Sequence, residues 1–161
     1  MKKSTSFLTI GALVAFAAVN TASAQVTQTV TFQVTAINQI SVTGAPSLVI
    51  NAATAGSAPT SVTASGNSWS VTTNQSTAMI TASIASAMPA GLTLSANLTA
   101  PAGATSTGFT ALGTVAVNVV TGITKLNSAA LGLSYQLDAT AAAGVVGSAT
   151  RVVTYTITGG V

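Results

Sequence analysis

The chain has 161 residues, of which only four are basic and one is acidic, with no histidine and no cysteine. Nucleic-acid binding is excluded, because neutralising a polyanion needs several clustered lysines or arginines. A histidine base, a thiolate nucleophile, paired carboxylates, a conventional zinc site and a calcium site are excluded as well. We therefore expect no enzymatic activity, no cofactor and no metal.

The first 24 residues have the pattern of a secretory signal. Lys2 and Lys3 precede the uncharged apolar stretch 7–19, and small residues stand at 22–24. The apolar stretch is too short to cross about 30 Å of hydrocarbon. We expect cleavage between Ala24 and Gln25, a secreted or cell-surface location, no transmembrane segment after signal removal, and a single domain over residues 25–161.

Few charges remain after residue 24, namely Lys125, Asp138 and Arg151. A net charge near zero favours association between molecules. The absence of cysteine means that no disulfide supports the fold outside the cytoplasm. Stability has to come from burial and from backbone pairing.

The first mature segment is predicted to be the longest strand. Its apolar residues, mostly at alternating positions, are Val26, Val30, Phe32, Val34, Ala36, Ile40 and Val42. Threonine and glutamine occupy most of the intervening positions, as expected for a strand with one buried face. Ile37 interrupts the alternation, which predicts a bulge near residues 37–38. The sequence Gly-Ala-Pro at 44–46 ends the run.

Short strands with turn residues between them are predicted along the middle of the chain. A strand at 48–50 precedes a polar loop, and residues 60–64 and 69–73 suggest a hairpin joined through 65–68. Alternating apolar residues then predict strands at 80–84 and 92–98, with a turn at 88–91 between them.

The last third of the chain continues the same pattern. Strands are predicted at 115–119, before a turn at 121–122, and at 131–137. A small-residue loop at 141–147 leads to a last strand at 150–158. With eight or nine strands at this spacing, we expect an all-β antiparallel sandwich or barrel.

Several individual residues are candidates for ligand binding or for covalent modification. Trp69 is the only tryptophan; it suits a core anchor, and the alternative is a surface that stacks on sugars. Lys125 with Asp138 and Asn118 or Asn127 could form an intramolecular isopeptide bond, against a solvated lysine in a turn. Asn74 and Asn97 lie in glycosylation sequons, which arise by chance in chains rich in Asn and Thr.

The two ends of the chain carry a resemblance. The opening residues 29–34 (TVTFQV) and the closing residues 152–157 (VVTYTI) flank a Thr/Gly-rich β domain. This layout resembles bacterial secreted immunoglobulin-like surface subunits, including the spore-coat-U and fimbrial-subunit type and some WxL-like wall proteins. The resemblance implies an immunoglobulin-like sandwich, in which an N-terminal segment within 25–43 completes the groove of a neighbouring subunit.

The resemblance also implies roles for individual residues. The donor side chains are then Val30, Phe32, Val34 and Ala36, and the final strand with Val153, Tyr155 and Ile157 borders the groove. The chain lacks the disulfide common in fimbrial subunits, and no flexible linker precedes Gly44. The same segment therefore equally suits the first strand of its own domain, because strand addition and sheet pairing use the same backbone bonds.

These features favour a structural subunit of an extracellular filament, coat or biofilm matrix. Its partners are expected to be further copies of itself or other surface subunits. The alternative is a monomeric adhesin-like or carbohydrate-binding module that uses the loops at 52–59 and 101–108.

Overall fold

The structure, a computed structural model, describes residues 23–160. The chain divides into two compact units, Met1–Gln33 and Val34–Val161. The described part of the first unit, residues 23–33, contains no helix or strand and is exposed, including Ala24 and Gln25 at the predicted cleavage site. Most of the predicted signal segment, residues 1–22, lies outside the described residues.

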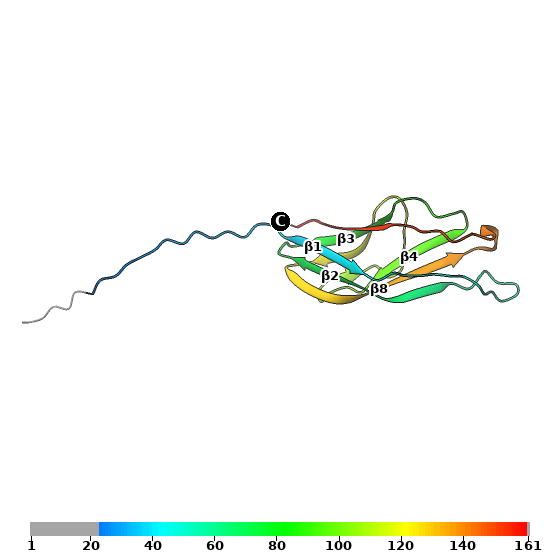
Figure 1. Cartoon of the computed structure of the whole chain (residues 1–161), viewed down its shortest axis with the longest axis horizontal. Coiled ribbons are helices and arrows are strands. Elements are labelled where there is room, and N and C mark those ends of the chain that lie inside the picture. Colours follow the sequence, from blue (N-terminus) through cyan, green and yellow to red (C-terminus); the bar gives the residue numbers. More distant parts are fainter. Residues whose placement is uncertain (1–22, 161) are drawn as a thin grey trace, which may run out of the picture. The chain divides into compact units, whose positions relative to one another are not determined.

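The second unit is an all-β fold, which confirms the predicted class. Its strands form two antiparallel sheets (Figure 1). The first sheet has the order β1 (Asn38–Thr43), β2 (Val62–Thr73), β8 (Leu126–Ala139), β4 (Leu92–Leu98) and β6 (Thr110–Ala111). The second has the order β5 (Thr105–Ser106), β7 (Val117–Ile123), β3 (Ala78–Ile84) and β9 (Val153–Thr158). This arrangement is a β-sandwich.

Helical structure is nearly absent from the described residues. One 3₁₀ turn, η1 (Ala141–Ala143), follows β8. Nowhere in residues 23–160 does a helix reach the length and apolarity needed to cross a membrane.

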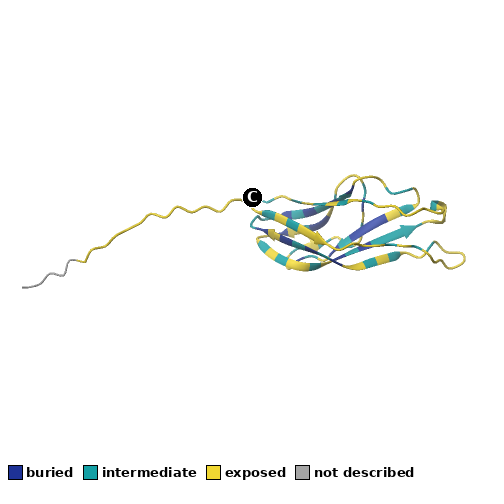
Figure 2. Cartoon of the chain, in the orientation of Figure 1, coloured by how far each residue is buried: buried dark blue, intermediate teal, exposed yellow. Residues whose placement is uncertain are grey.

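The core lies between the two sheets and follows the alternation of the strands. In β3, Ala78, Ile80, Ala82 and Ile84 are buried, while the residues between them are partly exposed. β4 and β8 contribute Leu98 and Leu133 in the same way (Figure 2). Full burial of a large aliphatic side chain contributes about 1.5–3 kcal/mol, so this layer supplies much of the stability.

Trp69 lies in this core. It is 1% exposed, and its indole Nε1 donates a hydrogen bond to the carbonyl oxygen of Thr99 at 3.2 Å. The side chain is therefore not available as a surface for stacking on sugars.

The predicted N-terminal strand is wrong over most of its length. Only Asn38–Thr43 form a strand, and residues 26–37 do not. The ladder between β1 and β2 ends at the pair Asn38 and Thr73, where β2 itself ends. Residues before Asn38 consequently have no neighbouring strand with which to pair, whatever their alternation.

The hairpin predicted over residues 60–73 is wrong as well. β2 runs without a break from Val62 to Thr73, and its register against β8 shifts between Ala64 and Asn67. Three steps along β2 match two steps along β8 there, which is a β-bulge. Gly66 has φ +84°. A bulge with a left-handed glycine and a tight turn share the same sequence signal.

The later boundaries also differ from the predictions. β7 continues through Gly122 to Ile123, so the turn falls at 124–125, where Lys125 has φ +40°. β8 begins already at Leu126, and β9 begins at Val153 rather than at 150. Residues 48–50 form no strand, because the chain leaves the edge of β2 after Thr43.

Candidate functional site

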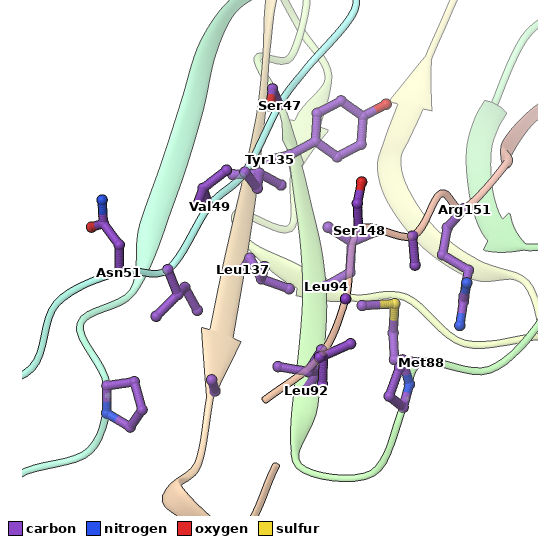
Figure 3. A pocket seen from close by; sticks show the side chains of 18 of the residues that line it. Ser47, Val49, Asn51, Met88, Leu92, Leu94, Tyr135, Leu137, Ser148 and Arg151 are labelled. Atoms are coloured by element: carbon purple, nitrogen blue, oxygen red, sulfur yellow. The ribbon is translucent and has the colours of Figure 1, made fainter. Parts of the chain in front are cut away.

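A large groove opens between the two sheets beside β8. It has a volume of about 1100 Å³. Side chains of β4 and β8 form its base, notably Leu92, Leu94, Tyr135 and Leu137. Figure 3 shows Val49 and Asn51 on one side of these residues and Ser148 and Arg151 on the other. The base is therefore apolar, and the two sides come from segments about one hundred residues apart in the sequence.

The first side, which we call the front lip, consists of residues 45–51. It directly follows Gly44, whose φ is +119°. A Cβ atom at Gly44 would lie 2.1 Å from Oδ1 of Asn67, so only glycine fits where the chain leaves β1. Leu48 and Ile50 are half-buried whereas Val49 is 65% exposed. The front lip thus keeps a strand-like alternation toward the groove without belonging to a sheet.

The second side, which we call the back lip, consists of residues 145–151. Its end is fixed by Arg151, whose Nε and Nη2 donate to the carbonyl oxygen of Ala87 at 3.2 and 3.1 Å. The amide of Ala85 donates to the carbonyl oxygen of Val152 at 3.0 Å, just before β9 begins. The guanidinium of Arg151 therefore holds the back lip against the connection between β3 and β4.

The backbone groups of both lips are not used in pairing within residues 23–160. Within the described chain, residues 45–51 and 145–149 exchange no hydrogen bond with other backbone groups. Most residues of both lips are exposed, so water can reach these backbone groups and a further strand can pair with them. Two such rows on either side of an apolar base have the chemistry to accept one extended strand between them.

Two tyrosine hydroxyls meet beside the groove. Tyr155 on β9 donates a hydrogen bond to the hydroxyl oxygen of Tyr135 on β8 at 2.9 Å. Burial raises the pKa of Tyr155, and the bond to Tyr135 raises it further. Burial also raises the pKa of Tyr135, while the bond it accepts acts in the opposite direction. Both hydroxyls stay neutral at physiological pH, so the pair is a structural bridge between the sheets.

The lysine and the carboxylate considered for an isopeptide bond are not brought together. Lys125 and Asp138 lie at opposite ends of β8, roughly 40 Å apart at about 3.3 Å per residue. The carboxylate of Asp138 instead accepts hydrogen bonds from Nε2 of Gln136, at 2.9 and 3.1 Å, and from the hydroxyl of Ser61. Lys125 is exposed in the turn between β7 and β8. The described residues contain no cluster of three or more His, Cys, Asp or Glu side chains.

The predicted donor residues are exposed. Val30 is 73%, Phe32 89% and Val34 78% exposed, and Ala36 is exposed as well. None of them belongs to a strand. The segment therefore places four alternating apolar side chains, one of them aromatic, in water.

Of the three residues predicted to border the groove, one lines it and two do not. Val153 lines the groove, whereas Tyr155 and Ile157 pack against the core beyond it. Sequence reasoning missed the residues that form most of the site, namely the two lips and the leucines of the base. The one available signal for the front lip was the alternation at 48–50, which was read as a short strand.

The two loops named for carbohydrate binding are not adjacent. Residues 52–59 are closed by a bridge between Ala53 and Pro59 and precede the start of β2, where Val62 pairs with Leu137. Residues 101–108 follow β4, whose last residue Leu98 pairs with Leu133. The first loop therefore lies near Leu137 of β8, whereas the second leaves the sheet near Leu133.

Comparisons with known proteins add no relative. No family model, no curated protein and no solved structure matches this chain.

Proposed function

We propose that this protein is a secreted structural subunit that assembles into an extracellular filament, coat or matrix by donating a strand. The N-terminal segment 25–36 of one copy inserts into the groove of the next copy. The observation that carries the proposal is the pair of unpaired lips on either side of an apolar base.

The donor segment matches the groove in chemistry. Val30, Phe32 and Val34 share one face of an extended chain, and polar residues share the other. The apolar face would lie on the leucines of the base, and burial of each large side chain would contribute about 1.5–3 kcal/mol. Residues 30–36 in extended form span roughly 23 Å, and the back lip has the same number of residues.

The topology favours insertion into a second copy over insertion into the same chain. At the first residue of β1, Nδ2 of Asn38 donates to the carbonyl oxygen of Gly159 at 3.4 Å, so the donor segment joins the sandwich beside the end of β9. The groove begins beyond the other end of β1, after Gly44. Folding back would require a reversal at residues 36–37 and passage across β1. Donation to a second copy is head-to-tail, and such a contact produces a linear polymer when the rotation between copies does not close a ring.

The scarcity of charge suits this assembly. Between residues 25 and 161 only Lys125, Asp138 and Arg151 are charged, and the Arg151 guanidinium already binds main-chain carbonyls. Exposed strand edges are usually protected by charged side chains that repel other edges. The lips carry no such protection apart from Arg151 at the end of one of them.

The test uses the mature chain, residues 25–161, and a truncated chain that starts at residue 37. Size-exclusion chromatography and electron microscopy should show polymers for the first and monomers for the second. A synthetic peptide of residues 25–36 should bind the truncated chain. A matched control peptide exchanges only Phe32 with Gln33, which keeps the composition and places the phenylalanine on the opposite face from Val30 and Val34.

Two outcomes contradict the proposal. Truncated chains that polymerise as well as the mature chain would show that the segment 25–36 is not the donor. A mature chain that stays monomeric, with no affinity for the peptide, would favour the monomeric binding module instead.

A further inference from the structure

The base of the donor segment is held by one side chain, Asn74. Its Oδ1 accepts a hydrogen bond from the amide of Ile37 at 2.8 Å, and its Nδ2 donates to the carbonyl oxygen of Thr35 at 2.7 Å. The amide of Asn74 itself donates to the carbonyl oxygen of Ile37 at 3.2 Å. All three bonds lie within the second unit, Val34–Val161.

Neighbouring residues hold Asn74 in this orientation. Nε2 of Gln75 donates to Oδ1 of Asn74 at 2.7 Å. The hydroxyl of Thr73 donates to Oδ1 of Asn38 at 2.6 Å and accepts from the amide of Gln75 at 3.0 Å. The side chain of Asn74 thereby takes the place of the strand partner that residues 35–37 lack, because β2 ends at Thr73.

We propose that Asn74 is a positioning residue that fixes residues 35–37 to the sandwich and thereby sets the stiffness of the joint between successive subunits. This inference rests on the proposed function, in which the residues ahead of this held stretch lie in the groove of the next copy. The joint is then the short stretch between the inserted strand and β1. If residues 35–37 are held, neighbouring sandwiches keep one angle to each other; if they are free, the joint behaves as a flexible linker.

The arrangement also assigns the sequon at Asn74–Ser76 a structural role. Both polar atoms of the Asn74 side chain are engaged, Oδ1 twice and Nδ2 once. A glycan attached at Nδ2 would replace one of its two hydrogens and leave a single hydrogen for the bond to Thr35. The sequon at Asn97 differs, since its Oδ1 accepts from the hydroxyl of Ser106 at 3.3 Å while its Nδ2 has no hydrogen-bond partner among residues 23–160.

The experiment compares the mature chain with Asn74→Ala and with Asn118→Ala. Asn118 is an exposed asparagine on β7 whose side chain makes no hydrogen bond within the described residues, so its variant is the matched control. Persistence length is measured on filaments by electron microscopy. We expect Asn74→Ala to shorten it severalfold and Asn118→Ala to leave it unchanged. Asn74→Asp keeps an acceptor for Ile37 but loses the donor to Thr35, and should give an intermediate value.

A second measurement tests the contact without filaments. In a Phe32→Asp background, which prevents insertion of the donor, the backbone order parameters of residues 35–37 are measured by NMR. We expect values near 0.85 with Asn74 and below about 0.6 after Asn74→Ala, the ranges typical of rigid and flexible backbone. Equal values in the two proteins would overturn the proposal, as would filaments of equal stiffness.

The affinity of the peptide 25–36 for the truncated chain separates this inference from the proposed function. Asn74→Ala should leave that affinity unchanged, because Asn74 does not line the groove. Loss of peptide binding in the parent protein contradicts strand donation, and unchanged order parameters contradict the role of Asn74.

Discussion

The hydroxyl of Tyr155 donates to the hydroxyl of Tyr135 across the sandwich at 2.9 Å, joining edge strand β9 of one sheet to central strand β8 of the other. These are the only two tyrosines of the chain. A hydrogen bond between two neutral hydroxyl groups therefore helps to connect the sheets.

This pair predicts a loss of stability at alkaline pH. Folding raises the pKa of both hydroxyls above the usual value near 10, mainly through burial. Above pH 10 the unfolded chain has released protons that the folded chain retains. The contribution of the tyrosines to the free energy of unfolding should therefore be fully present below about pH 10. Above that pH the free energy of unfolding should fall by at most about 1.4 kcal/mol per pH unit for each tyrosine. Urea denaturation at a series of pH values measures it.

The double variant Tyr135→Phe with Tyr155→Phe provides the control. It should be less stable at neutral pH by about 1 kcal/mol, the usual net value of one hydrogen bond. Its tyrosine-dependent decline above pH 10 should disappear. A decline as steep as in the parent protein would contradict this assignment.

A second prediction concerns the core under β4. Leu98 is fully buried, so Leu98→Ala should lower the free energy of unfolding by about 2–5 kcal/mol. Fluorescence of Trp69, the single and buried tryptophan, reports the transition in both proteins. Val115→Ala is the control, because Val115 is 77% exposed, and it should change stability by no more than about 0.5 kcal/mol.

A third prediction concerns the point where the front lip begins. Gly44→Ala should destabilise the protein by more than Gly56→Ala, although both positions have positive φ. A Cβ atom at Gly56 meets nothing within 4 Å, so only the backbone strain of about 1–2 kcal/mol applies there. At Gly44 the clash with Asn67 adds to it.

Thermal denaturation of Gly44→Ala, Asn67→Ala and the double variant separates the two contributions. In the Asn67→Ala background the cost of Gly44→Ala should shrink but stay above that of Gly56→Ala, because the clashing amide is gone while Cβ of residue 67 remains 2.9 Å from the added atom. Additive costs would show that the contact between the two residues is unimportant.

A fourth prediction tests the backbone pairing offered by the lips. A peptide of residues 25–36 that is N-methylated at Thr31 cannot donate one main-chain hydrogen bond but keeps every side chain. It should bind the truncated chain about tenfold more weakly, since each lost bond costs roughly 1–1.5 kcal/mol. Isothermal titration calorimetry gives the affinities. N-methylation at Gln25, outside the apolar run, is the control, and equal affinities for both peptides would exclude pairing with the lips at Thr31.

Sequence patterns predicted the fold class and several strands well. β3 and β4 follow strict alternation with both ends marked by turn residues, and both were placed within two residues. Such strands are recognisable because their burial depends on the local period of two.

Other elements depended on which strand lies next to them. Residues 30–36 alternate as clearly as β3 but lie outside the sheet because β2 ends at Thr73. The bulge at Gly66 looked like a turn, since both require the same residue. The groove was the least predictable feature. Its lips, near residues 48 and 148, become neighbours only through the sheet order, which no local pattern encodes.

The orientation of the lips has a mechanical consequence if strands are donated as proposed. A segment lying lengthwise between the two sheets would be pulled along its own axis when the polymer is stretched. Its main-chain bonds would then share the force and break together, rather than one after another as in a peeled hairpin. A cysteine-free, nearly uncharged polypeptide would in this way resist tension through shear geometry alone.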